Sequence, residues 1–137
     1  MDCSVSTSNC LAEGIRHRFA QAVADDDHDA AVATLADHVE FRSPAVYRPY
    51  HGKEQVAGIL RLVATVFEGF RYTAEWRDGR TTILFFEASV GDRELQGVDI
   101  LEDGDDGLVE RFTVMIRPLS GLQAVAGAMA ERLGISP

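Results

Sequence analysis

The residue with the clearest chemical potential is Asp99, which stands in the middle of the run GVDIL. Its neighbours are apolar, and Gly97 leaves room beside it on the same side of a predicted strand. A buried carboxyl group must be paired, hydrogen-bonded or protonated, because burial of an unpaired charge is costly. The pattern therefore leaves two readings of Asp99: an acid held inside a cavity, or a surface residue on a bent or edge strand.

The four histidines are the next candidates, because imidazole titrates near neutral pH. His17 and His28 fall on polar helix faces or turns, where we expect them to be solvated, and His38 precedes a strand as a cap or surface residue. His51 lies in a loop before a helix, where either a structural role or a place at a cavity mouth is open. Ser43 has no histidine or aspartate at a spacing that indicates a nucleophile.

Metal and cofactor chemistry is not indicated. Cys3 and Cys10 lie in a polar opening segment without the histidines that would complete a zinc site, so we expect reduced thiols. The aspartates at 25–27 predict a turn and a helix cap, and the acidic segment 102–106 lacks the calcium-loop pattern. No glycine-rich phosphate loop or cofactor fingerprint occurs. We therefore expect a protein without a metal or cofactor.

Composition limits the partners. The chain has 137 residues and a formal net charge of −9, from 13 Lys and Arg against 22 Asp and Glu. Such acidity disfavours nucleic acids and anionic membranes, and no apolar run approaches the roughly 18 residues of a membrane span. The opening residues lack the pattern of a signal peptide, so we expect a cytoplasmic protein. The polar segment 1–10 is expected to be disordered and residues 11–137 to form a single domain.

The apolar periodicity indicates which elements must position Asp99. A helical stripe begins at Leu11 and ends at the aspartates 25–27, and a short second helix follows with Val32, Leu35 and Ala36 on its buried side. A strand over 39–43 ends at Pro44, and a helix with a wide apolar face lies between Gly52 and Gly69. Four strands connected by hairpins follow, over 70–77, 81–90, 94–101 and 108–117, before a last helix that ends at Gly134.

This order of elements predicts an α+β fold with helices packed on one face of a curved antiparallel sheet. Strand alternation places Leu84, Phe86, Asp99 and Phe112 on the inner face, together with Val114 and Ile116. Outward positions are predicted for Arg42, Arg111 and Arg117 and for Phe85 and Met115, whose exposure would favour a homodimer through the outer face. Trp76 is predicted to share a face with Tyr72 and Ala74.

The chain resembles the nuclear transport factor 2-like superfamily, in its SnoaL-like or ketosteroid-isomerase-like branch. The resemblance extends from about Leu11 to Arg117. It is carried by the segments RFAQAVADDDHDAAVATLADHVEFRSP, YRPYHGKEQV and LQGVDIL. It implies a cystatin-like α+β cone whose interior takes a hydrophobic small molecule.

Ketosteroid isomerases use three residues that can be compared one by one. Their tyrosine on the first helix corresponds to Phe19 here, their catalytic aspartate before a proline to Ser43, and their protonated aspartate of the oxyanion hole to Asp99. One match in three argues against true ketosteroid isomerisation, because the base and half of the oxyanion support are missing. Limonene-epoxide-hydrolase-like members use two aspartates and an arginine, and no inward-facing arginine is predicted here.

We therefore expect a pocket with Asp99 on its wall, and two functions stay open. One is a cofactor-free isomerase, cyclase or hydrolase that uses Asp99 as acid or base. The other is a non-catalytic ligand-binding or dimerisation module, so the sequence does not decide whether the chain is an enzyme. The other expected ligand-binding residues are apolar or aromatic except for one serine: Phe19, Phe41, Ser43, Tyr47, Tyr50, Leu84, Phe86, Phe112, Val114 and Ile116.

Overall fold

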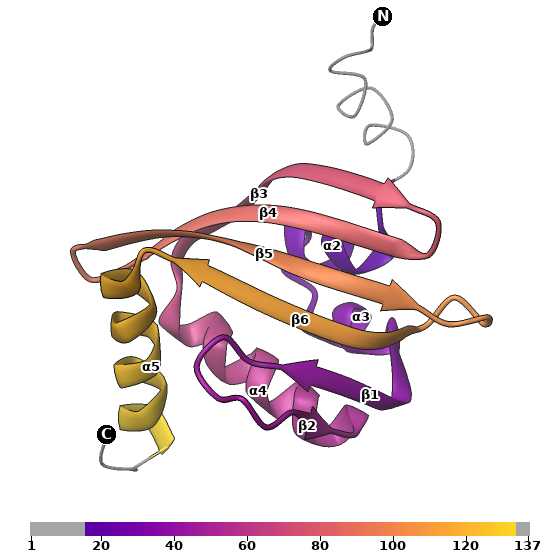
Figure 1. Ribbon diagram of the computed structural model, residues 1–137, viewed down its shortest axis with the longest axis horizontal. Helices are drawn as coiled ribbons and strands as arrows, with labels where there is room; N and C mark the ends of the chain where they lie inside the picture. Colours follow the sequence, from indigo (N-terminus) through magenta and orange to yellow (C-terminus); the bar gives the residue numbers. More distant parts are fainter. Residues whose placement is uncertain (1–15, 134–137) are drawn as a thin grey trace, which may run out of the picture.

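The computed structural model describes residues 16–133, and these form one sheet with helices on its concave side (Figure 1). The helices are α2 (Arg18–Ala24), α3 (His28–Ala33), α4 (Lys53–Val66) and α5 (Leu119–Leu133). The strands are β1 (Leu35–Arg42), β2 (Tyr50–His51), β3 (Glu68–Asp78), β4 (Thr81–Val90), β5 (Arg93–Asp103) and β6 (Val109–Arg117). No helix in this range is long and apolar enough to cross a membrane.

The sheet has the strand order β2-β1-β6-β5-β4-β3. The four long strands β3 to β6 pair antiparallel, as the hairpin pattern predicts, and Gly79 and Gly91 adopt positive φ angles in two of the turns. Strand β1 pairs with β6 in a parallel direction, which the sequence pattern did not indicate. The predicted α+β architecture is confirmed, with a mixed rather than a purely antiparallel sheet.

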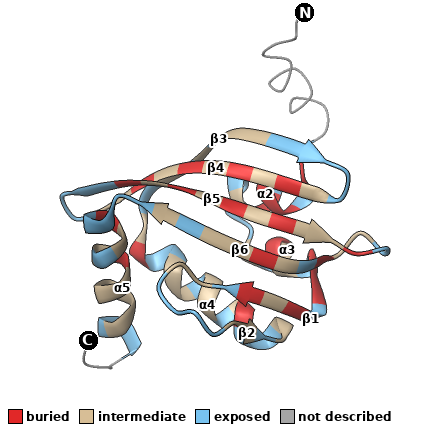
Figure 2. Ribbon diagram, in the orientation of Figure 1, coloured by how far each residue is buried: buried red, intermediate tan, exposed pale blue. Residues whose placement is uncertain are grey.

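Burial alternates along the central strands (Figure 2). The inward residues Leu84 and Leu101 are fully buried under α2 and α3, in one core with Phe19, Phe41 and Phe112. A second core surrounds Phe86 and Leu95, where α5 contacts β4, β5, β6 and α4. The helices therefore pack on the concave face in two separate cores, and a ligand site can lie between these cores.

Several predicted element boundaries were wrong or could not be located. The second helix ends at Ala33, so Leu35 and Ala36 belong to β1, where both are buried. The third helix ends at Val66, and Gly69 lies within β3 with a positive φ angle. The predictions for Leu11, Cys3, Cys10, Gly134 and the segment 1–10 fall outside residues 16–133.

A bulge in β3 changes which of its residues face inward. Tyr72 pairs with Phe86 and Ala74 with Phe85, so Thr73 is an extra residue on β3. Tyr72 therefore faces the concave side, whereas Ala74 and Trp76 face outward. The prediction that Trp76 shares a face with Tyr72 was wrong, because strict alternation does not continue through a bulge.

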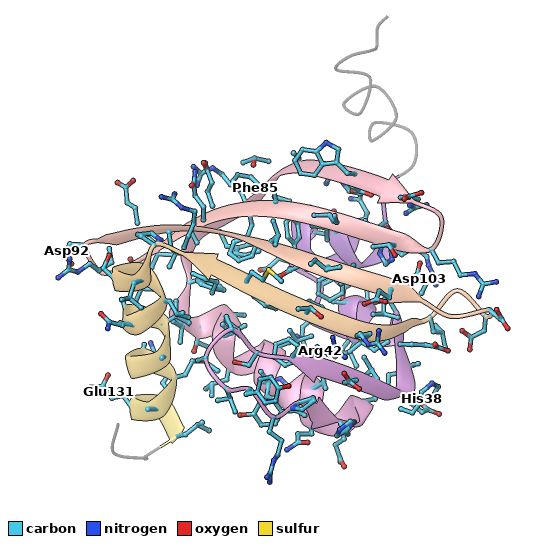
Figure 3. All side chains as sticks on the ribbon, in the orientation of Figure 1. His38, Arg42, Phe85, Asp92, Asp103 and Glu131 are labelled. Carbon is cyan, nitrogen blue, oxygen red and sulfur yellow. The ribbon has the colours of Figure 1, made fainter. Side chains whose placement is uncertain are left out.

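The outer face of the sheet carries an apolar row across three strands. Phe85 pairs with Val98, which pairs with Met115, and Met115 is 55% exposed. Figure 3 labels Phe85 on this side of β4. The predicted outward arginines are partly or fully exposed, and Arg111 forms an ion pair with Glu102. Homodimerisation through this face stays a prediction.

Gly97 is required by close packing between β5 and its neighbours. A Cβ atom at this position would lie 2.5 Å from the carbonyl oxygen of Met115 and even closer to the ring of Phe86. The space beside Asp99 that the sequence attributed to Gly97 is therefore occupied by the Phe86 ring.

We predict that Gly97→Ala destabilises the fold by about 1–3 kcal/mol, because the Met115 backbone cannot yield to the new methyl group. Gly127→Ala on α5 is the matched control. Nothing lies within 4 Å of its added Cβ, so it should stabilise the helix by up to about 1 kcal/mol. Urea unfolding measures both changes. Equal effects of the two substitutions would contradict the packing role of Gly97.

Candidate functional site

A cavity of about 940 Å³ lies between the concave face of the sheet and the helices. Its walls are mainly aromatic and aliphatic, which suits a hydrophobic small molecule. Helix α4 contributes Ile59 and Val63, and α5 contributes Val125 and Met129. The carboxyl and phenol groups of Asp99 and Tyr72 interrupt this apolar wall.

Asp99 occupies the middle of β5 and points into the concave side. It lies between Leu84 on β4 and Val114 on β6, and the residue is only 6% exposed. Its Oδ2 atom accepts a hydrogen bond of 2.5 Å from the Tyr72 hydroxyl group. Within residues 16–133, this is the one hydrogen bond of the Asp99 side chain. Asp99 is therefore buried in the cavity wall, and the surface reading is wrong.

Tyr72 is held against Asp99 by the β3 bulge and by aromatic packing. Its ring meets Phe70 edge to face with centroids 5.0 Å apart, and it meets Phe86 in the same way at 6.4 Å. Such contacts limit the ring to a few orientations. The aromatic contacts therefore orient the Tyr72 ring so that its hydroxyl group points at Asp99.

Burial determines the protonation of this pair. Burial raises the pKa of Asp99 from 3.8 to about 7, and the hydrogen bond from Tyr72 acts in the opposite direction because it favours the carboxylate. Burial and the adjacent Asp99 raise the pKa of Tyr72 well above its ordinary value. Tyr72 therefore keeps its proton, and Asp99 exists in both neutral and ionised forms near neutral pH. Such a carboxyl group can act as an acid or as a base.

Most of the predicted ligand-binding residues line the cavity. Three of them form an aromatic cluster, in which the Phe112 ring lies 5.1 Å from Phe19 and 5.3 Å from Phe41 between centroids. The others that line it are Ser43, Tyr50, Phe86, Val114 and Ile116.

Two predicted ligand-binding residues do not line the cavity. Leu84 is fully buried in the core beneath it, and Tyr47 is fully exposed on the loop after β1. His51 is exposed on β2 opposite Glu40 and does not line the cavity either. The histidine that lines it is His28, which the sequence had placed in solvent.

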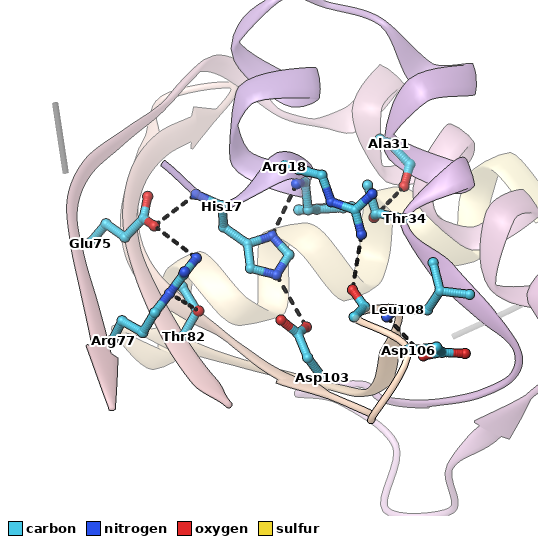
Figure 4. A network of polar contacts seen from close by, with 12 residues as sticks. His17, Arg18, Ala31, Thr34, Glu75, Arg77, Thr82, Asp103, Asp106 and Leu108 are labelled. Carbon is cyan, nitrogen blue, oxygen red and sulfur yellow. Dashed lines mark hydrogen bonds and ion pairs between the residues drawn. The ribbon is translucent and has the colours of Figure 1, made fainter. Parts of the chain in front are cut away.

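The prediction that His17 is solvated was also wrong, since this residue is only 4% exposed. Figure 4 shows its contacts. Its Nδ1 atom accepts a hydrogen bond from the Phe19 backbone at 3.0 Å, and its Nε2 atom lies 3.1 Å from Asp103 Oδ1. Its backbone nitrogen donates to Glu75 at 2.9 Å. These contacts fix the start of α2 against β3 and β5, and so position Phe19 in the cavity wall.

Solved structures resemble most of this chain. A steroid delta-isomerase from Pseudomonas aeruginosa is 39% identical, with a TM-score of 0.81 over 96% of this chain and 93% of that one. An uncharacterised protein with a cystatin-like fold from Silicibacter pomeroyi DSS-3 is 33% identical, with a TM-score of 0.80 over 85% and 83%. An NTF-2 like protein of unknown function from Burkholderia xenovorans LB400 is 21% identical, with a TM-score of 0.63 over 72% and 77%. No protein-family model and no curated protein matches.

The raised pKa of Asp99 makes stability depend on pH. Between pH 3.8 and about 7, the folded chain keeps a proton on Asp99 that the unfolded chain has released. The contribution of this proton to the free energy of unfolding is therefore complete below that range and is lost as the pH rises through it. The loss is on the order of 4 kcal/mol, at about 1.4 kcal/mol for each pKa unit. We predict that Asp99→Asn removes this slope in urea unfolding and exceeds the wild type in stability at pH 8. The exposed Asp92→Asn should retain the slope, and parallel curves for wild type and Asp99→Asn would contradict the assignment.

The hydrogen bond from Tyr72 should also be measurable through Asp99. Because this bond favours the carboxylate, Tyr72→Phe is expected to raise the pKa of Asp99 above about 7. The carboxyl ¹³C resonance of Asp99 reports the titration. Tyr50→Phe, on the same cavity wall, is the control and should leave that titration unchanged. An unchanged or lower pKa in Tyr72→Phe would show that the pair does not form.

Proposed function

This chain belongs to the nuclear transport factor 2-like superfamily, and from that premise we propose that it binds a hydrophobic small molecule and acts on it through Asp99. The observation that carries the proposal is the Asp99–Tyr72 pair in the wall of a largely apolar cavity. Apolar walls supply affinity without dictating chemistry, whereas a buried carboxyl group that changes protonation near pH 7 can move a proton.

The proposed chemistry is cofactor-free acid–base catalysis. Neutral Asp99 donates a hydrogen bond to a carbonyl oxygen of the ligand and stabilises the negative charge that develops there, while Tyr72 supports the carboxyl group from its other side. Ionised Asp99 accepts a proton from the ligand. Isomerisation, cyclisation and hydrolysis of a ketone, lactone or epoxide all use such a group.

A second candidate is a binding module without catalysis. Phe19 and Ser43 line the cavity where the resemblance to ketosteroid isomerases would require a tyrosine and an aspartate. Without these groups, the cavity keeps a shape that binds a hydrophobic molecule but lacks two of the three polar residues that ketosteroid isomerases use. This departure also favours a reaction other than ketosteroid isomerisation.

The test combines binding with proton exchange. Hydrophobic ketones, lactones and epoxides are screened by thermal shift, and 2-decalone is then followed by NMR for exchange of its α-hydrogens with D₂O. We predict that the wild type is stabilised by members of this set and accelerates the exchange. Asp99→Asn should lower the accelerated rate by about 100-fold, the lower end for general acid–base catalysis.

The control is Asp92→Asn, which makes the same change at an exposed turn (Figure 3) and should keep both activities. Binding with no exchange, or exchange unaffected by Asp99→Asn, would favour the binding module. A screen in which no compound stabilises the wild type would overturn the proposal as a whole.

A further inference from the structure

Helix α5 forms one side of the cavity and is buried against the sheet only near its N-terminal end. A Cβ atom on Gly121 would lie 2.8 Å from Leu95 on β5, so the first turn of α5 packs directly on the sheet. One turn later, Val125 is buried in the second core and lines the cavity. Gly121 and Val125 are the two buried residues of this helix. In Figure 1, α5 starts beside the end of β6 and runs away from it, so its C-terminal end lies apart from the four long strands.

The C-terminal half of α5, residues 126–133, lines the cavity without being buried. Met129 and Ala130 are half-buried, and Leu133, which also lines the cavity, is 59% exposed at the end of the helix. Local opening costs little free energy where few apolar contacts are buried. This half of the helix can therefore move away from the cavity at a smaller cost than the half that is packed on the sheet.

Arg132 joins the C-terminal half of α5 to the end of α4. Its Nε atom donates a hydrogen bond of 3.0 Å to the Thr65 hydroxyl group, and its Nη2 atom donates one of 3.3 Å to the Thr65 carbonyl oxygen. Its Nη1 atom donates to the carbonyl oxygen of Ala128, within α5, at 3.4 Å. Among residues 16–133, the two bonds to Thr65 are the hydrogen bonds that join α4 and α5.

The charge of Arg132 also favours contact between the two helix ends. Both α4 and α5 end beside this residue, and the carbonyl groups at a helix C-terminus carry a partial negative charge. The last turn of α4 contains no basic residue of its own. The guanidinium group of Arg132 therefore offsets the negative ends of both helices, and its loss would favour their separation.

We propose that α5 is a lid whose C-terminal half opens away from α4, and that Arg132 is the clasp that keeps this lid closed. A hydrophobic ligand then enters and leaves between the two helices, where Val63 of α4 and Met129 of α5 line the cavity. Rupture of the contact between Arg132 and Thr65 limits both rates. This inference goes beyond the proposed function, since it concerns access to the cavity and holds whether or not Asp99 reacts.

The first test measures opening of the lid without a ligand. Cys3 and Cys10, the two cysteines of the chain, are replaced by serine, and Ile116→Cys places a thiol on β6 in the core that α5 covers. Mass spectrometry follows its reaction with N-ethylmaleimide. We predict that Arg132→Gln accelerates this reaction about fivefold, the effect of one hydrogen bond. Arg132→Lys should accelerate it less, because an ammonium group keeps the charge and loses the planar pair of donors.

Three further variants separate the clasp from other effects. Glu131→Gln changes the neighbouring charge on α5 (Figure 3) and should leave the labelling rate unchanged. A thiol introduced by Ala22→Cys, on the buried face of α2 in the other core, should react no faster with Arg132→Gln, because only α5 opens. Thr65→Val removes one acceptor on α4 and leaves α5 intact, so it should accelerate labelling, and its effect should not add to that of Arg132→Gln.

The second test measures ligand exchange. Prodan, an uncharged fluorescent ketone, is mixed with the protein in a stopped-flow instrument. We predict that Arg132→Gln increases the association and dissociation rates together, so that Kd changes less than either rate. Accelerated labelling with unchanged prodan exchange would overturn the route between α4 and α5.

Equal labelling of the Ile116→Cys thiol with and without Arg132→Gln would overturn the lid. The same acceleration by Glu131→Gln, or at the Ala22→Cys thiol, would also overturn it, because Arg132 would then act on the helix end or on the whole fold. If labelling responds as predicted while neither prodan nor any compound of the wider screen binds, the lid stands and the proposed function is overturned.

Discussion

The burial of one carboxyl group, with one hydrogen bond from a tyrosine, is the constraint on which the rest of this structure depends. Asp99 lies between apolar strand neighbours, and its removal from water makes the ionised form costly. Tyr72 offsets part of that cost by donating to Oδ2. The result is a carboxyl group near its midpoint of titration at neutral pH, and its pKa is determined by burial and by the hydrogen bond from Tyr72.

The surrounding fold is arranged so that this pair can exist. The bulge at Thr73 turns Tyr72 inward, and the same shift sends Glu75 to the inner side, where it accepts a hydrogen bond from the His17 backbone. His17 then fixes the start of α2, which brings Phe19 against Phe112. One irregularity in a strand thus positions both the hydrogen-bond donor of Asp99 and the helix that closes the cavity beside it.

The features that were predictable from sequence follow from regular periodicity. Alternation in β4, β5 and β6 identified the inner face, including Asp99, because these strands keep their register on both sides of Asp99, up to an irregularity at Glu102 and Asp103. Tyr72 was missed as the partner of Asp99, and His17 and His28 were assigned to solvent. The reasons are physical: a bulge has no signal in composition, and His17 is buried by Glu75 on β3 and Asp103 on β5, which are distant in the sequence. The parallel pairing of β1 with β6 likewise joins residues that are far apart in the sequence, so local patterns do not indicate it.

The position of the pair in an apolar cavity links ligand binding to protonation. A ligand that fills the cavity excludes water from Asp99, which makes the carboxylate still less favourable unless the ligand donates a hydrogen bond to it. A ligand oxygen that accepts a hydrogen bond therefore selects neutral Asp99, and the acid is loaded with its proton as the complex forms. Ser43 adds no charge to the wall, and the other carboxyl groups that line the cavity, those of Asp26 and Asp27, belong to exposed residues. When the ligand leaves and water re-enters, hydration favours the carboxylate form of Asp99 again, so occupancy of the cavity and the protonation of this one group are coupled.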